Sequence, residues 1–405
     1  MTWKTAVTSL ASATMLLGWG CGGPTGEPGP GASGDALLLA VSVFATNQDG
    51  SPNPLPARMA ILEPSGDGWN HRFIEDPDSN VFHKAMAYRG GGVEGILTLG
   101  GTKAAVKLWK PDGSRSTLWE ADFGGEFSRM RDAEVGDIYG DGSAAIAVAT
   151  HDQGVVSVLR PDGAGGFSVD ELGAAPDTIV HEIEIGDLDG DRTLEVYATP
   201  SSPNELDGSP QPGSVVRYVP ANREGPVTVA DLGVRHAKEI LVDDVDGDGR
   251  DELYVAVEAV SGGQVEIQRF DADTGPTEGR VIARLDDQLC RFLAAGDIDG
   301  DGVLELVAAT HKAGLFLLRR SGESWTQEII ATDSSSFEHA TILLDLDGNG
   351  RDELYVASDD QGQVRRYTWE NGAWEREIIL EYADGFPRFT WNIMAAPVAL
   401  VPAGP

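Results

Sequence analysis

The residues in this sequence that are best suited to chemistry are carboxylates that recur in a fixed pattern. The fullest copy is Asp244-Val-Asp-Gly-Asp-Gly-Arg-Asp-Glu252, with acids at its first, third, fifth and ninth positions. This spacing gathers hard oxygen ligands on one small loop, and glycine permits the sharp turns that such a loop needs. Calcium prefers this kind of donor set, so the pattern predicts a calcium site. The alternative is a solvated turn, since Asp and Gly favour turns in any case.

Copies of the loop recur along the chain, and each is followed by a strand-like apolar run. Their first aspartates stand at positions 137, 187, 244, 297 and 345, which are about 50 residues apart. The unit around Asp137 reads as four short strands, at 130–136, 144–150, 155–159 and 167–172. A four-stranded unit repeated at this period is typical of a β-propeller blade.

The length of the chain then predicts the number of blades. A body that starts at Ala36 has about 370 residues, which is about seven periods. Strands expected at 37–46, 57–62 and 69–74 lack an inner strand, and the segment 388–394 lacks a blade. We therefore predict an all-β fold, a seven-bladed β-propeller of four-stranded antiparallel blades over residues 36–405. Its N-terminal strands share the last blade with the C-terminal strand and close the ring.

These acidic repeats resemble the VCBS and FG-GAP repeats, which are related to the calcium-bearing blades of the integrin α-subunit propeller. The resemblance covers residues 36–402 and implies about four structural Ca²⁺ ions. It implies side-chain ligands at Asp187, Asp189, Asp191 and Glu195; at Asp244, Asp246, Asp248 and Glu252; at Asp297, Asp299, Asp301 and Glu305; and at Asp345, Asp347, Asn349 and Glu353. A backbone carbonyl would be added by Thr193, Arg250, Val303 and Arg351. The Phe-Gly and Gly-Ala-Pro landmarks are missing, so integrin-like ligand recognition is not implied.

Two loops depart from the pattern. In the Asp137 copy, Tyr139 and Ala145 replace two ligands, so Asp137 and Asp141 are expected to hold no tight metal. The first blade has a decayed loop that contains the glycines of 90–95 in a G-x-G-x-x-G arrangement. Because this stretch lies in an all-β repeat with no helix after it, we do not expect a dinucleotide site.

A second pattern appears six residues before each loop, where every blade carries a basic or imidazole side chain. The positions, with their equivalents in the degenerate blades, are His83, Arg131, His181, Lys238, Arg291, His339 and Arg388, and His236 is an alternative occupant in the fourth blade. Propeller closure should bring these residues to one mouth, on the face opposite the acidic loops. The loops that hold His151 and His311 reach the same face.

This basic ring has a structural and a functional interpretation. The cations can simply pair with neighbouring acids such as Asp132, Glu182 and Glu239. As a binding site, a mixed ring suits an anionic ligand, whereas a subset of the histidines suits a transition metal. A mouth rich in imidazole is also compatible with a lyase or dehydratase that acts on an anionic sugar, with histidine as acid and base. We identify no ordinary catalytic motif.

The N-terminus reads as an export signal. One charge, Lys4, precedes an apolar stretch at 6–17, which is too short to span a membrane, and Cys21 follows in a lipobox-like setting. We predict a signal peptide over 1–21 with lipidation at Cys21, and a Gly- and Pro-rich tether over 22–35. The expected location is the bacterial cell envelope, as an outer-membrane lipoprotein, with ordinary secretion as the alternative.

The charge and the cysteine content of the sequence limit the kinds of partner that we expect. The sequence has 65 Asp and Glu against 30 Lys and Arg, a net charge of −35, which argues against nucleic acid and against a membrane contact other than the lipid anchor. Cys290 is the one cysteine in the body, so no disulfide can form there and metal is the expected substitute. The sequence thus favours a surface-anchored propeller that binds a polysaccharide, a protein or a small anionic ligand without catalysis.

Overall fold

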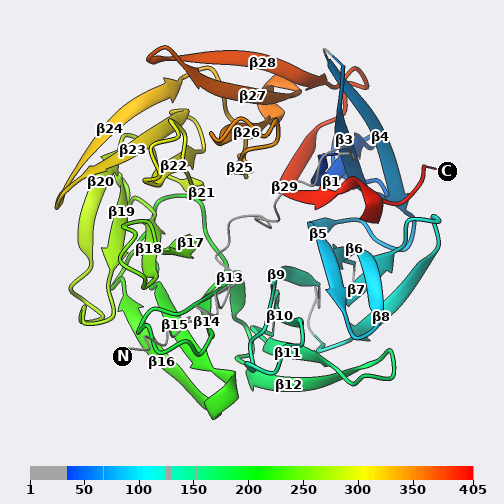
Figure 1. Cartoon of the computed structure of the whole chain (residues 1–405), viewed down its shortest axis with the longest axis horizontal. Helices are drawn as coiled ribbons and strands as arrows, with labels where there is room; N and C mark the ends of the chain where they lie inside the picture. The colour runs from blue at the N-terminus through cyan, green and yellow to red at the C-terminus, as the bar shows by residue number, and fades with distance from the viewer. Residues whose placement is uncertain (1–33, 67, 102, 125–128, 152, 405) are drawn as a thin grey trace, which may run out of the picture.

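The computed structural model describes residues 34–66, 68–101, 103–124, 129–151 and 153–404. In these residues the chain forms seven antiparallel sheets, set as blades around a central axis (Figure 1). The seven-bladed propeller predicted from the sequence is confirmed. The described residues contain no helix long and apolar enough to cross a membrane. The predicted signal segment, Cys21 and residues 22–33 of the tether lie outside the described residues.

Six blades are built from consecutive strands, numbered here by chain order. Blade 1 has β5 (Phe82–Gly90), β6 (Val93–Gly100), β7 (Ala104–Trp109) and β8 (Arg115–Ala121); blade 2 has β9 (Met130–Gly136), β10 (Ala145–Thr150), β11 (Val156–Pro161) and β12 (Phe167–Gly173); blade 3 has β13 (Ile179–Gly186), β14 (Glu195–Ser201), β15 (Ser214–Val219) and β16 (Glu224–Asp231). Blade 4 has β17 (Ala237–Asp243), β18 (Glu252–Val257), β19 (Val265–Phe270) and β20 (Arg280–Leu285); blade 5 has β21 (Cys290–Gly296), β22 (Glu305–Thr310), β23 (Leu315–Ser321) and β24 (Ser324–Ala331); blade 6 has β25 (Thr341–Leu344), β26 (Glu353–Ser358), β27 (Gln363–Glu370) and β28 (Ala373–Glu381). Short 3₁₀ turns are η1 (Pro220–Asn222), η2 (Asp359–Gln361) and η3 (Val398–Leu400).

The seventh blade closes the ring with both ends of the chain. Its inner strand is β29 (Arg388–Pro397), which pairs with β1 (Asp35–Thr46), and β3 (Ala57–Ser65) and β4 (Gly68–Asp76) follow outward. The short strand β2 (Pro52–Pro54) pairs with the end of β1. The sequence predicted this sharing of one blade, which removes the open sheet edges of a linear array.

The core lies between the blades rather than inside any one of them. The second strands β10, β18, β22 and β26 are buried at every residue, because each blade is covered on both faces by its neighbours. The outer strands lie at the rim of the ring (Figure 1), and their residues are mostly exposed or half-buried. Cys290 is a free, buried thiol at the start of β21, and burial raises its pKa, as expected for an inert cysteine.

Bulges near the start of the inner strands free backbone groups that the preceding blade satisfies. The pairing of β13 shifts between Val180 and Ile183, and Asp132 of blade 2 accepts a hydrogen bond from the Ile183 N–H at 3.0 Å. In the same way Glu239 of blade 4 accepts one from the Leu293 N–H of blade 5 at 3.0 Å. These carboxylates fix neighbouring inner strands to one another where those strands begin.

Candidate metal loops and propeller mouth

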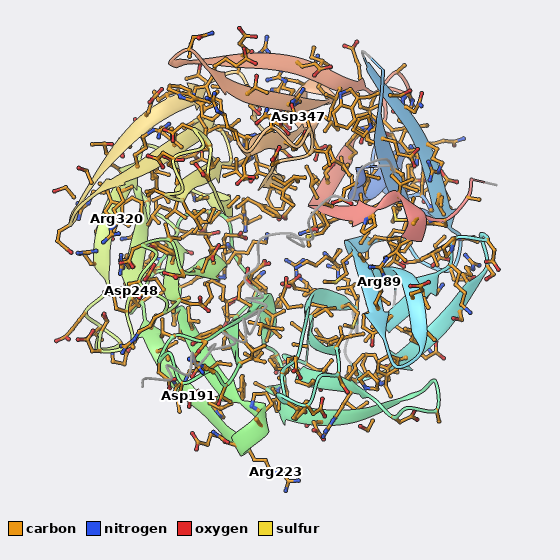
Figure 2. All side chains as sticks on the ribbon, in the orientation of Figure 1. Arg89, Asp191, Arg223, Asp248, Arg320 and Asp347 are labelled. Atoms are coloured by element: carbon orange, nitrogen blue, oxygen red, sulfur yellow. The ribbon has the colours of Figure 1, made fainter. Side chains whose placement is uncertain are left out.

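The first candidate site is repeated four times, in the loops that connect the inner and second strands of blades 3 to 6. Each loop brings carboxylate oxygens within 4.8 Å of one another. The clusters consist of Asp187, Asp189 and Asp191; of Asp244, Asp246, Asp248 and Glu252; of Asp297, Asp299 and Glu305; and of Asp345, Asp347 and Glu353. Figure 2 shows Asp191, Asp248 and Asp347 spread around the ring, one in each of blades 3, 4 and 6.

The loop of blade 4 shows how the sequence shapes each site. Asp244 folds back over its own loop and accepts hydrogen bonds from the N–H groups of Asp248 and Gly249, both at 2.9 Å. Asp248 accepts one from the N–H of Arg250 at 3.0 Å. Gly247 has a φ of +72° with open space around it, so the glycine is needed for its conformation and not for its size. The backbone thereby presents the remaining carboxylate oxygens to one point.

The ninth residue of each loop begins the second strand and is buried. In blade 4 the carboxylate of Glu252 accepts a hydrogen bond from the Tyr254 hydroxyl at 3.1 Å, and in blade 6 Glu353 accepts one from Tyr355 at 2.8 Å. In blade 5 Glu305 accepts the N–H of Ile298 at 3.1 Å. Burial raises the pKa of Glu252, Glu305 and Glu353 to about 7. A nearby cation would lower these pKa values and favour the ionised form.

An arginine from the third strand reaches every one of these loops, and the sequence analysis did not find it. In blade 4 Arg269 lies 2.8 Å from Asp246 and 3.3 Å from Glu252. The equivalent side chains in the other three blades are Arg217, Arg319 and Arg366. Each guanidinium pairs with the third and ninth residues of its loop, so it offsets part of the repulsion among the acids. The recurrence of arginine in the third strands was the available signal.

The residues present fit calcium. The ligands are hard oxygens in number and spacing suited to the ion. The Oδ1 atoms of Asp246 and Asp299 are buried and have no hydrogen-bond partner among the described residues, although their Oδ2 atoms are paired with arginine. A buried carboxylate oxygen without a partner is costly, and a bound cation would satisfy it. Of the predicted acidic ligands, Glu195 and Asp301 lie outside the tight clusters; Glu195 is bonded to Arg217 and Tyr197.

The degenerate loop of blade 2 contrasts with these four. Arg160 pairs with Asp141 and stacks over the ring of Tyr139, with its Cζ 4.5 Å from the ring centroid. The acids of this loop form no cluster of the kind seen in blades 3 to 6, among the residues that the structure describes. Here a protein cation stands beside Asp141.

The second candidate site is the mouth, which we define as the end of the central axis where the inner strands begin. Five members of the predicted ring gather there: His83, Arg131, His181, Lys238 and Arg291. The Arg131 guanidinium donates a hydrogen bond to Nδ1 of His181 over 3.3 Å. Burial lowers the pKa of His83 and of His181 well below the usual value, and the positive charges of neighbouring residues lower it further.

The two remaining members of the ring are engaged elsewhere. His339 is fully buried, with Nδ1 2.6 Å from the Thr310 carbonyl and Nε2 2.7 Å from the Ser334 hydroxyl. Arg388 pairs with Asp384 and stacks on Tyr382. A shared repeat position therefore does not give all seven residues a shared environment.

The other histidines at this face are placed less centrally. His236 of blade 4 bonds to Ser201 at 3.0 Å, and its ring lies edge-on to His181 at 5.1 Å. His311 packs against Phe337, with the two ring centroids 5.9 Å apart. His151 is one of the neighbours that lower the pKa of His83. In the described part of the chain, no histidine belongs to a group with metal-binding spacing, so the geometry lends the transition-metal alternative no support.

The comparisons with known proteins bear on the fold and on one repeat. Residues 244–308 match the family model of the FG-GAP-like repeat. That segment runs from the acidic loop of blade 4 into the second strand of blade 5. The propeller carries an FG-GAP-like repeat. No curated protein sequence matches the chain.

Similar solved structures cover nearly the whole propeller. An Agrocybe aegerita lectin, described as recognising non-reducing terminal N-acetylglucosamine, is 14% identical with a TM-score of 0.50, over 89% of this chain and 96% of that one. A mutant of Synechocystis apocarotenoid oxygenase is 12% identical with a TM-score of 0.52, over 90% and 93%. A putative 6-phosphogluconolactonase from Bacteroides fragilis is 11% identical with a TM-score of 0.52, over 91% and 100%. At these identities the likeness concerns the fold alone.

Proposed function

We propose that this protein is an exported, surface-anchored propeller that is stabilised by calcium and binds an extracellular partner, a polysaccharide or a protein, without catalysis. The observation that carries the proposal is the acidic loop that occurs four times and brings carboxylate oxygens within 4.8 Å of one another. In two of these loops a buried carboxylate oxygen has no partner in the part of the chain that the structure describes. Loops of this extracellular type bind Ca²⁺ with a Kd of roughly 10⁻⁴ to 10⁻³ M, which suits a compartment rich in the ion.

Calorimetric titration of the mature body with Ca²⁺ tests the first half of this proposal. We expect about four ions per chain, because each of four loops gathers three or four carboxylates within 4.8 Å. Titration with Mg²⁺ is the control, since that smaller ion demands near-octahedral geometry and gives up its water reluctantly. The absence of any Ca²⁺ binding at millimolar concentration would overturn the calcium half.

A screen of immobilised glycans and envelope proteins tests the second half. The proposal draws support from the presence of a lectin among the similar folds and from the aromatic and basic residues at the mouth. The anchor is tested separately by Cys21→Ser, which should move the protein from the membrane fraction to the soluble fraction without changing its melting temperature. If the wild-type protein, after the cell has removed residues 1–20, is found entirely in the soluble fraction, the anchor is excluded.

The alternative function is a lyase or dehydratase that acts on an anionic sugar at the mouth. It is favoured by the buried His83, whose lowered pKa keeps the imidazole neutral, as a general base requires, and whose Nε2 has no partner among the described residues. Incubation with acidic glycans, followed by detection of unsaturated sugar products in the ultraviolet, separates the two functions. Product formation that His83→Gln abolishes would replace the binding proposal with the catalytic one.

A further inference from the structure

Two arginines and three aromatic rings form a continuous arc at the mouth. The Cζ of Arg131 lies 5.5 Å from the ring centroid of Trp391, and Trp391 lies 5.9 Å from Phe389. Phe389 is 5.4 Å from Phe337, and the Cζ of Arg291 lies 4.9 Å from Phe337. All three rings are only partly buried. This cation–aromatic arc thus presents apolar ring surface to solvent between two guanidinium groups.

The arc breaks the repeat. Arg131 and Arg291 come from the inner strands β9 and β21, Trp391 and Phe389 from the closing strand β29, and Phe337 from the connection between β24 and β25. At the bulge where the inner strands of blades 2 and 5 carry Arg131 and Arg291, β29 carries Trp391. A feature copied in each blade serves the blade, whereas one assembled from different segments is available for a specific ligand.

One of the three cations at this part of the mouth has no direct carboxylate partner in the part of the chain that the structure describes. Lys238 pairs with Glu338 at 2.6 Å, and Arg291 pairs with Glu258 at 3.3 Å. Among the described residues, no carboxylate lies within ion-pair distance of Arg131, whose hydrogen bond goes to the ring of His181. The neighbouring cations lower the pKa of Glu258 and of Glu338 although burial opposes this, so both acids are ionised. Three cations therefore have two direct carboxylate partners within the described ranges, while Asp132 and Glu182 act on Arg131 from beyond ion-pair distance.

The hydrogen bond to His181 identifies a second unmet need. A guanidinium can only donate, so Nδ1 of His181 must accept, and the neutral ring carries its proton on Nε2. The His181 side chain is buried, with 7% of the residue exposed, and Nε2 has no acceptor in the described part of the chain. Nε2 of His83, whose ring lies 4.4 Å from Trp391, also lacks a partner. An N–H donor next to a guanidinium that has no carboxylate at ion-pair distance is suited to bind the carboxylate of a ligand.

We propose that the mouth binds the carboxylate-bearing sugar of an acidic glycan, a uronate, with its carboxylate at Arg131 and its ring against Trp391 and Phe389. This inference rests on the proposed binding function and specifies its ligand. The aromatic rings provide rigid apolar surface for the non-polar face of the sugar, and the Arg131 guanidinium, which has no ion-pair partner among the described residues, matches one carboxylate. Arg291 holds the far end of the arc, against Phe337.

Calorimetry with an oligoglucuronate tests the proposal, at one saturating Ca²⁺ concentration throughout. The matched probe is the methyl ester of the same oligosaccharide, which keeps the ring and loses the charge. We expect the ester to bind about tenfold more weakly, because hydrogen bonds to a charged group are the strong ones. Arg131→Ala should weaken binding of the acid about tenfold or more and leave that of the ester nearly unchanged. Trp391→Ala should weaken both.

Glu338→Gln is expected to strengthen binding, and a misfolded variant cannot give that result. This change removes one negative charge from the cluster with little change in shape, so binding of the oligoglucuronate should become several-fold tighter. Arg89→Ala is the control that should leave the affinity unchanged, since that side chain is 61% exposed and lies outside the arc (Figure 2). Every variant should keep the calcium-dependent melt of the wild type.

The outcomes separate this inference from the function on which it rests. Equal affinity for acid and ester, or an unchanged affinity in both Arg131→Ala and Glu338→Gln, would overturn the uronate inference. If a neutral glycan or a protein binds instead, the uronate inference fails and the proposed binding function stands. If neither glycan nor protein binds in the wider screen, both fail.

Discussion

The two ends of the inner strands carry opposite chemistry and are built in opposite ways. At the loop end, four blades repeat one acidic loop, and each loop pairs with an arginine of its own blade. At the mouth, the cations and aromatic rings of the arc come from different blades and meet only in the closed ring. In a repeat protein the copied feature stabilises the unit, and the feature that departs from the copy is where specificity can arise.

The largest expected effect is on the loop end, where calcium should be part of the folded state. With four sites and a Kd of about 1 mM, 10 mM Ca²⁺ stabilises the folded protein by roughly 1.4 kcal/mol per site, or about 5 to 6 kcal/mol in all. Chelator should therefore lower the melting temperature by several degrees in a scan followed by circular dichroism. If the melt does not respond to chelator, the arginines alone neutralise the loops and the contrast between the ends disappears.

The next effect concerns a carboxylate at the mouth that is held protonated. Burial raises the pKa of Glu239 to about 8, from an ordinary value near 4.5. Between these values the folded protein keeps a proton that the unfolded chain has lost, so this group makes stability fall as the pH rises from 4.5 to 8. Each unit of the interval corresponds to at most about 1.4 kcal/mol.

Glu239→Gln isolates this contribution. The amide oxygen can still accept the hydrogen bond of Leu293 and cannot ionise. The variant should match the wild type in urea unfolding at pH 5 and be more stable than it at pH 9, by roughly 2 kcal/mol or more. Parallel pH profiles for the two proteins would show that Glu239 is ionised in the folded state.

The smallest effect compares a complete loop with the degenerate one. Asp246→Ala should remove one Ca²⁺ from the titration and about 1.4 kcal/mol of the stabilisation at 10 mM Ca²⁺. Asp141→Ala is the matched control, because Arg160 already stands beside that aspartate, and it should leave the calcium stoichiometry unchanged. An equal loss in both variants would mean that blade 2 holds an ion after all.

The sequence allowed prediction of whatever repeats locally. The phase of the acidic loops and the four-strand units gave the blades, and unpaired strands at the two ends gave the closure between β1 and β29. Position in the repeat was a weaker guide at the mouth. His339 has a φ of +53° and both ring nitrogens bonded, so it does not follow the course of its counterparts.

The residues that the sequence did not reveal are those whose contacts cross between blades or strands. Trp391 stands at the bulge of its inner strand, where Arg131 and Arg291 stand in theirs, but the bulge in β29 is visible only in the folded pairing. Only the closed ring brings Trp391, Phe389 and Phe337 beside the two arginines. The third-strand arginines were missed because their partners lie across a hairpin, at a sequence distance that varies between blades. Long-range pairing of this kind depends on the tertiary fold, which local patterns do not encode.

The pairing of β29 with β1 also governs when this protein can be completed. Asp35 and Pro397 are partners in one ladder although roughly 360 residues separate them, so the strand that closes the ring is synthesised only after the other six blades. Until it arrives, β1 presents an unpaired edge beside apolar blade faces, and such intermediates are prone to aggregate.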